Sequence, residues 1–185
     1  MRVITGSARG RRLKQLEGLE TRPTTGRVKE AVFSILQFDI EGRRVLDLFA
    51  GTGQLGIEAL SRGAASAVFV EKRRDAANLI RENLKLTELT ARARVVGGEA
   101  EAFLAGCRER FDLIFLDPPY AAGLLEGALE MISRFDILAN HGIMVCESPA
   151  ERELPDLPAP YSKHRVYHYG KTRITTYHRE EDVER

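Results

Sequence analysis

The chain has 185 residues and a mass of 20.7 kDa, of which 43% are hydrophobic and 30% charged. This length suits one compact domain with a small extension, and the composition excludes collagen, coiled-coil and disordered chains. No apolar run approaches the roughly 20 residues that span a bilayer, and the first residues lack the apolar segment of a signal peptide. The two cysteines, Cys107 and Cys146, lie in apolar surroundings, which favours reduced core thiols. We therefore expect a soluble, cytoplasmic, globular protein.

The formal net charge of +1 conceals a strong asymmetry along the chain. Residues 1–29 carry eight Lys or Arg against two Glu, residues 157–179 carry five Lys or Arg and no acid, and the rest of the chain carries −10. Two basic ends that meet at one cleft would bind a polyanion, so nucleic acid is favoured over the alternative of a solvated charged surface. The cationic candidates for RNA contact are Arg9, Arg11, Arg12, Arg22, Arg27 and Lys171.

The expected elements fall into two parts, a basic N-terminal extension over residues 1–40 and a core domain over 41–185. In the extension, a hairpin with strands at 1–5 and 11–16 precedes an amphipathic helix that Thr24 or Thr25 would cap. In the core, continuous apolar strands alternate with helices, which is typical of a parallel sheet covered on both faces. The expected strands are 45–49, 67–70, 94–96, 113–116 and 143–146, and the expected helices are 53–62, 73–86, 100–107 and 124–135.

The last part of the chain breaks this alternation. The strand-like runs 163–169 and 173–179 flank Gly170 and predict an antiparallel hairpin. His164 and His168, four residues apart in the first run, would share one face of the strand. No third ligand accompanies them, so we expect no metal site.

A glycine-rich segment joins the first core strand to its helix. Gly51, Gly53 and Gly56 match G-x-G-x-x-G in the strand–turn–helix setting that binds nucleotide cofactors. Glu71 ends the next strand 20 residues after Gly51, where an acid binds the ribose hydroxyls, and this leaves NAD and S-adenosylmethionine open. Asp47 favours S-adenosylmethionine, because a carboxylate there would repel a pyrophosphate and attract the ammonium of a methionyl group. Beside the loop, Phe49 is a candidate either for packing on the cofactor or for the core.

The run Asp117-Pro118-Pro119-Tyr120 follows the strand at 113–116, at the sheet edge where α/β proteins bind ligands. The plain alternative is a rigid strand exit, since two prolines end strands and helices alike. However, Asp117 and a carbonyl at Pro118 supply two acceptors beside the aromatic face of Tyr120. Such acceptors would orient the exocyclic amine of a planar base toward a sulfonium methyl and stabilise the charge that develops on nitrogen. The pattern predicts methyl transfer to a planar amine.

These motifs together resemble the RsmD family, the bacterial small-subunit (16S) ribosomal RNA guanine-N2 methyltransferases. The resemblance covers nearly the full length, and its cofactor and Asp-Pro-Pro-Tyr motifs are shared with many methyltransferases. Two N-terminal segments single out this family, and the terminal hairpin also resembles it. The three segments are Gly6-Ser-Ala-Arg-Gly-Arg-Arg-Leu13, Thr21-Arg-Pro-Thr24 with Arg27-Val-Lys-Glu-Ala-Val-Phe33, and Tyr169-Gly-Lys-Thr172.

The resemblance implies a Rossmann-like class I S-adenosylmethionine-dependent methyltransferase fold, with a mostly parallel seven-stranded sheet that ends in an antiparallel hairpin. It also implies methyl transfer to N2 of a flipped guanine, in ribosomal RNA or a partly assembled small subunit, with S-adenosylhomocysteine as product. A monomer is expected. By this resemblance the base is held by Asp117, Pro118 and Tyr120, the cofactor by Asp47, Gly51, Gly53 and Glu71, and RNA by Arg22 and Arg27.

The chain departs from the family pattern at two positions. Gly26 stands where the family usually has Asp, which removes a carboxylate before the first helix. Glu99 stands where the family tends to have Asp, and its longer side chain is a candidate partner for the adenine amine of the cofactor.

Four other functions are weaker. A DNA adenine-N6 methyltransferase would share the mechanism but normally needs a target-recognition domain, for which the short flanks leave no room. A protein-glutamine methyltransferase usually carries Asn before the two prolines. A dehydrogenase would need hydride-site residues that do not accompany the glycines. A non-catalytic RNA-binding assembly factor would have no need for the intact Asp117 and Tyr120.

Overall fold

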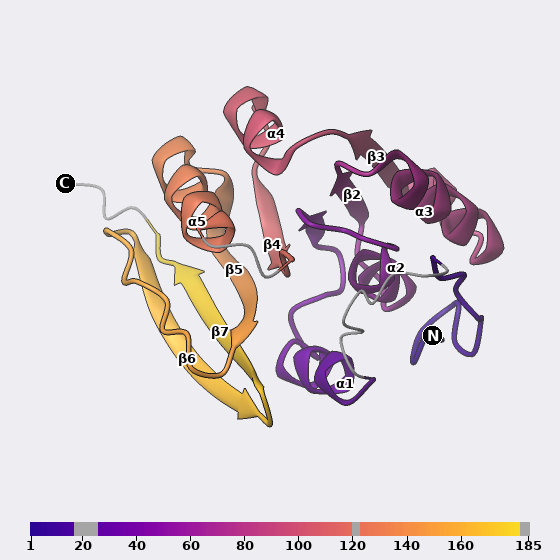
Figure 1. The fold of residues 1–185 in the computed structure, drawn as a ribbon, viewed down its shortest axis with the longest axis horizontal. Coiled ribbons are helices and arrows are strands. Elements are labelled where there is room, and N and C mark those ends of the chain that lie inside the picture. The colour runs from indigo at the N-terminus through magenta and orange to yellow at the C-terminus, as the bar shows by residue number, and fades with distance from the viewer. Residues whose placement is uncertain (17–25, 120–122, 182–185) are drawn as a thin grey trace.

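The computed structural model describes residues 1–16, 26–119 and 123–181. Its centre is a seven-stranded sheet in the order β3-β2-β1-β4-β5-β7-β6 (Figure 1). Strands β1 to β5 run parallel, β7 is antiparallel to β5, and β6 is antiparallel to β7. The strands are β1 (Arg44–Asp47), β2 (Ser66–Glu71), β3 (Ala93–Gly97), β4 (Phe111–Leu116), β5 (Leu138–Pro149), β6 (Tyr161–Tyr169) and β7 (Thr172–Arg179). The predicted mostly parallel sheet with a terminal antiparallel hairpin is confirmed.

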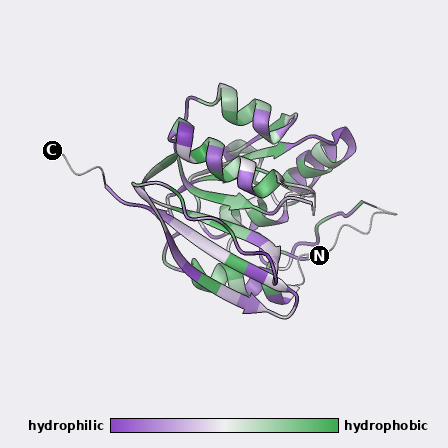
Figure 2. Ribbon diagram, turned by 60° about the vertical axis from the view of Figure 1, so that its left-hand side comes forward, coloured by the Kyte–Doolittle hydropathy of each residue, from purple (hydrophilic) through white to green (hydrophobic). Residues whose placement is uncertain are grey.

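Helices cover both faces of this sheet, and each face has its own hydrophobic cluster. Val45 and Leu46 are neighbours in β1 and both fully buried, yet they belong to opposite clusters because side chains alternate along a strand. This two-sided burial explains why the strands are continuously apolar, and Figure 2 shows hydrophobic residues concentrated in the interior of the molecule. The first cluster takes side chains from α1 (Gly26–Ile35), α2 (Gln54–Ser61) and α3 (Arg74–Leu86), and the second from α4 (Ala100–Gly106) and α5 (Leu124–Phe135). A short 3-10 helix, η1 (Thr90–Arg92), leads into β3.

The predicted strands at 1–5 and 11–16 are reduced to one isolated antiparallel bridge between Arg2 and Arg12. The reason is that backbone groups of residues 1–16 form hydrogen bonds with side chains of α2 and α3 as well as with one another. The N–H groups of Ile4 and Thr5 donate to the Glu58 carboxylate of α2, at 2.9 and 3.0 Å. The predicted capping residues Thr24 and Thr25 lie outside the described residues.

β5 is longer than predicted. The apolar run that signalled it ends at Cys146, but the backbone continues as a strand to Pro149 because Glu147 to Pro149 pair with β7. This extension carries Glu147 to the edge of the sheet that holds the candidate site.

The prediction that His164 and His168 share a face is wrong. The register of β6 against β7 shifts between Lys163 and Arg165, so His164 falls at a bulge and stacks on His178 with ring centroids 4.1 Å apart. His168 lies opposite Arg173, an odd number of positions from His178 and therefore on the other face. Within the described ranges, no group of three or more His, Cys, Asp or Glu is placed to hold a metal ion. Likewise, none of the helices described is both long and apolar enough to cross a membrane.

Candidate functional site

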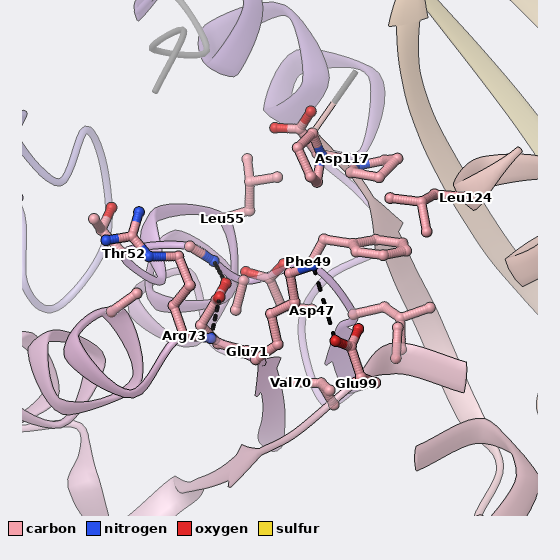
Figure 3. Close-up of a pocket in the computed structure, with 18 of the residues that line it drawn as sticks. Asp47, Phe49, Thr52, Leu55, Val70, Glu71, Arg73, Glu99, Asp117 and Leu124 are labelled. Carbon is pink, nitrogen blue, oxygen red and sulfur yellow. Dashed lines mark hydrogen bonds and ion pairs between the residues drawn. The ribbon is translucent and has the colours of Figure 1, made fainter. Parts of the chain in front are cut away.

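A cavity of about 930 Å³ opens at the carboxyl edge of the parallel strands (Figure 3). It lies where the strand order changes direction, between β1 and β4, which is the position where open α/β sheets bind ligands. Its walls come from the glycine loop after β1, the end of β2, the turn after β3 and the segment after β4. Candidate residues from separate stretches of the sequence thus line one space.

The glycine loop has a backbone that only glycine adopts easily. Gly51 and Gly53 have φ angles of 56° and 82°, in the left-handed region. At Gly56 the constraint is packing, because a Cβ there would lie 2.3 Å from the ring of Phe69 in β2. The loop therefore runs close along the sheet, with its backbone facing the cavity.

Glu71, at the end of β2, is held by two backbone donors. Its Oε2 accepts the N–H of Gly51 at 2.8 Å, and its Oε1 accepts the N–H of Arg73 at 2.9 Å (Figure 3). Each carboxylate oxygen can accept a further hydrogen bond. The side chain is therefore fixed relative to the loop while it keeps capacity for hydroxyl donors in the cavity.

Asp47, the last residue of β1, is 1% exposed. Burial raises the pKa of Asp47 to about 7, and the negative charges of Asp117 and Glu71 act in the same direction. The N–H of Gly56, which donates to Asp47 Oδ2 at 3.1 Å, opposes this rise. Three carboxylates around one cavity favour a cationic ligand group and disfavour a phosphate.

The segment after β4 supplies the other wall. Asp117, Pro118 and Pro119 all line the cavity, with Pro118 buried and Asp117 half-buried. Figure 3 shows Asp117 around the same cavity as Asp47 and Glu71. Tyr120 lies outside the described residues.

Two further candidates line the cavity. Glu99, in the turn after β3, has a mostly exposed side chain and forms an ion pair of 3.9 Å with Lys72 (Figure 3). Phe49 is half-buried and also packs against the second hydrophobic cluster, so it takes part in both the cavity and the core. Gly26 begins α1 and is exposed.

The cationic candidates differ in their surroundings. Arg9, Arg12 and Arg27 are exposed and form no ion pair with any other residue in the described ranges. Arg11, in contrast, donates to the carbonyl of Leu86 at 2.8 Å and pairs with Glu88 at 3.4 Å, so its charge is partly used within the fold. Arg22 lies outside the described residues.

The fold brings only part of the C-terminal positive charge to the carboxyl edge of the sheet. Lys171 sits at the tip of the β6–β7 hairpin, where its carbonyl accepts the N–H of Ala150 just after the carboxyl end of β5. Arg179 lies at the opposite end of β7 and bonds to Asp136.

Sequence reasoning missed two parts of the cavity wall. Glu147 lines the cavity from β5, and the rule that identified Glu71 and Asp117, an acid after an apolar strand, would have found it. The N-terminal segment also lines the cavity, and no local pattern signals this. Its lining residues are Met1, Gln15 and Leu16.

Comparison with known proteins identifies the family. A family model described as "Conserved hypothetical protein 95" matches residues 1–178. The chain is 39% identical over 180 residues to "Ribosomal RNA small subunit methyltransferase D" of Escherichia coli K12, covering 97% of this chain and 90% of that protein. The chain belongs to the RsmD family. Another relative, "Putative rRNA methyltransferase YlbH" of Bacillus subtilis 168, is 43% identical over 180 residues, covering 96% of this chain and 98% of that protein.

Solved structures agree with this membership of the RsmD family. The structure titled "Putative methyltransferase yhhF from Escherichia coli" has a TM-score of 0.88 and 36% identity, covering 98% of this chain and 99% of that one. A more distant neighbour, SMU.776, is a putative methyltransferase solved with SAH, and it has a TM-score of 0.62 at 14% identity. It covers 80% of this chain and 48% of that one, and it supports the fold alone. The fold is that of the class I S-adenosylmethionine-dependent methyltransferases, as the resemblance implies.

Proposed function

We propose that this chain is an S-adenosylmethionine-dependent ribosomal RNA methyltransferase, and that it transfers the methyl group to the exocyclic N2 amine of a guanine in the small-subunit RNA. The observation that carries the proposal is one cavity that combines a glycine loop, the buried carboxylate of Asp47, the half-buried carboxylate of Glu71, and the acceptors at Asp117 and Pro118. A member of the RsmD family with this arrangement has both a place for the methyl donor and a place for an amine.

The residues present fit the cofactor. Glu71 is oriented to accept hydrogen bonds from ribose hydroxyls, and Asp47 offers a negative charge to the ammonium of the methionyl group. Glu99 would accept a hydrogen bond from the adenine amine, and Phe49 would pack against the cofactor. When bound, S-adenosylmethionine supplies the methyl group on its sulfonium.

Transfer would form an N–C bond from the lone pair of the amine nitrogen to the methyl carbon and would break the C–S bond of the sulfonium. Asp117 and the Pro118 carbonyl would accept hydrogen bonds from the two amine N–H groups, orient the lone pair and stabilise the positive charge that develops on nitrogen. The alkylated nitrogen is acidic and loses one proton readily, so no strong general base is required. Stacking on Tyr120 would hold the base plane.

Glu147 supports guanine over adenine as the base. Leu116 of β4 pairs with Cys146 of β5, so Asp117 and Glu147 occupy adjacent positions on parallel strands, and both line the cavity. The edge of guanine next to its N2 amine carries a donor, N1–H, whereas adenine carries a lone pair at N1. A carboxylate at Glu147 would accept a hydrogen bond from the first and repel the second.

The test is transfer of labelled methyl from S-adenosylmethionine to small ribosomal subunits that lack base methylation, to naked small-subunit RNA and to duplex DNA. Modified nucleosides are identified by mass spectrometry. We expect N2-methylguanosine from the subunits, and its loss in Asp117→Ala. Asp112→Ala is the matched control, because Asp112 lies at the opposite end of β4 and bonds to Arg44.

Other outcomes would contradict the proposal. Methyladenine in DNA would assign the chain to the DNA adenine-N6 methyltransferases. Transfer to none of the three substrates, with the cofactor still bound, would favour a non-catalytic assembly factor.

A further inference from the structure

The N-terminal segment, defined here as residues 1–16, is both a wall of the cavity and a carrier of exposed positive charge. Its last residues line the same cavity as the glycine loop. The bridge between Arg2 and Arg12 joins its first arm, residues 1–8, to its second arm, residues 11–16. Arg9 lies exposed between the two arms. Any RNA held by these arginines would therefore touch a segment that borders the cofactor space.

The first arm of the segment is anchored on α2 by the carboxylate of Glu58, which also forms a buried ion pair. Glu58 is 0% exposed, pairs with the equally buried Lys29 at 3.0 Å, and accepts the N–H groups of Ile4 and Thr5. The Ser61 hydroxyl accepts the N–H of Ala8 at 2.9 Å. These contacts to the first arm involve no group of the second arm.

The backbone of the second arm is bound by Asn83 of α3, which is 0% exposed, while the Arg11 side chain of the same arm bonds to the carbonyl of Leu86. Its Oδ1 accepts the N–H of Lys14 at 2.8 Å, and its Nδ2 donates to the carbonyl of Lys14 at 3.1 Å. The same Nδ2 donates to the carbonyl of Thr52 at 3.1 Å, and Thr52 lies between Gly51 and Gly53 in the glycine loop. A single amide thus joins the N-terminal segment to the loop and uses both of its donor hydrogens to do so.

We propose that Asn83 is a positioning residue that couples RNA binding at the N-terminal segment to cofactor binding at the glycine loop. The inference rests on the proposed function. RNA bound to the segment would stabilise the arrangement in which Asn83 holds Thr52, so the cofactor would then bind a loop that is already arranged. By thermodynamic linkage, bound cofactor tightens RNA binding by the same factor.

The test measures the dissociation constant of S-adenosylmethionine by calorimetry, alone and with saturating unmodified small-subunit RNA. In the wild-type protein we expect RNA to tighten cofactor binding by about 10-fold, within the usual range of coupling between sites. Asn83→Leu, similar in size and uncharged, is expected to bring this ratio close to one. Asn78→Leu on the exposed face of α3 is the control and should keep the wild-type ratio.

A second pair of variants leaves Asn83 in place. Lys14→Pro removes the N–H that donates to Asn83, whereas Lys14→Ala keeps that N–H and removes only the exposed side chain, which pairs with Glu82. We expect Lys14→Pro to lose the coupling and Lys14→Ala to retain it. This pair decides the question even if Asn83→Leu does not fold.

The inference is overturned if the wild-type ratio is one, or if Lys14→Pro keeps the full ratio in a folded protein. If the wild-type protein methylates RNA, either of these two results refutes the coupling alone and leaves the proposed function in place. A wild-type protein that binds no cofactor refutes the proposed function itself.

Discussion

Replacing Asp47 by Asn tests whether the cavity contains a carboxylate that destabilises the free protein. The pKa of Asp47 is raised from 3.8 to about 7, so the folded state holds the proton more tightly than the unfolded chain does. Stability is therefore greatest when Asp47 is protonated, and it is lost as the pH rises from about 4 to about 7. Asn carries no charge at any pH, and its side-chain carbonyl can still accept the N–H of Gly56.

The magnitude follows from linkage. A difference between pKa values of 3.8 and about 7 corresponds to about 4 kcal/mol in all, of which about 3 kcal/mol falls between pH 5 and pH 8. The free energy of unfolding of Asp47→Asn, minus that of the wild type, should therefore increase by about 3 kcal/mol over this interval. At pH 8 the variant should be the more stable protein and yet bind S-adenosylmethionine more weakly.

The assay is urea denaturation of both proteins without cofactor at pH 5 and pH 8, with Asp112→Asn as the control. Asp112 is an acid of the same sheet that bonds to Arg44 and does not line the cavity, so its replacement leaves the carboxylates of the cavity in place. Parallel stability curves for wild type and Asp47→Asn would refute the reasoning, because they would mean that Asp47 titrates alike in the folded and unfolded states.

Three other predictions use different parts of the molecule. Asp117→Ala should lower methyl transfer by at least about 10²-fold while cofactor affinity changes only a few-fold, and a large loss of cofactor binding by calorimetry would contradict the role assigned to this carboxylate. Arg9→Ala should reduce the slope of log affinity for RNA against log salt by about one. Arg11→Ala should change this slope less, because the Arg11 side chain is held within the fold. Equal slopes in the two variants would contradict this difference between Arg9 and Arg11. Lys29→Met should lower the free energy of unfolding by about 1.5–3 kcal/mol, because it removes one of two cationic partners, Lys29 and Arg62, from the buried Glu58 carboxylate. Lys72→Met, at an exposed ion pair, should cost less than about 1 kcal/mol in the same denaturation experiment, and similar losses in both would count against the burial argument.

Local patterns in the sequence were sufficient for the architecture of the core. The helix expected at 124–135 has the observed bounds, and the one expected at 73–86 begins one residue later, because apolar residues recurring every three or four positions are a property of each segment alone. The same locality explains the errors. The apolar run at 143–146 did not reveal the rest of β5, whose polar end is stabilised by pairing with β7.

The candidate site could be assembled from the sequence because of one topological rule. Asp47 and Glu71 end parallel strands, Asp117 directly follows one, and the carboxyl ends of parallel strands meet at one edge. The roles given to these residues remain predictions. Glu147 directly follows the apolar run 143–146 and obeys the same rule, although it was not predicted as a site residue.

The set of elements, their alternation and the sheet edge at which the acids gather follow from local sequence, because each of these depends on neighbours within about one turn or one strand. Three features follow only from the packed fold: Asn83 joins Lys14 to Thr52, Arg11 is held by the end of α3, and Asp47 is buried deeply enough to titrate near neutral pH. These features depend on contacts between residues far apart in the chain, 69 positions for Asn83 and Lys14. A polar side chain carries no local mark of which distant backbone group it will meet, and packing of the whole fold makes that choice.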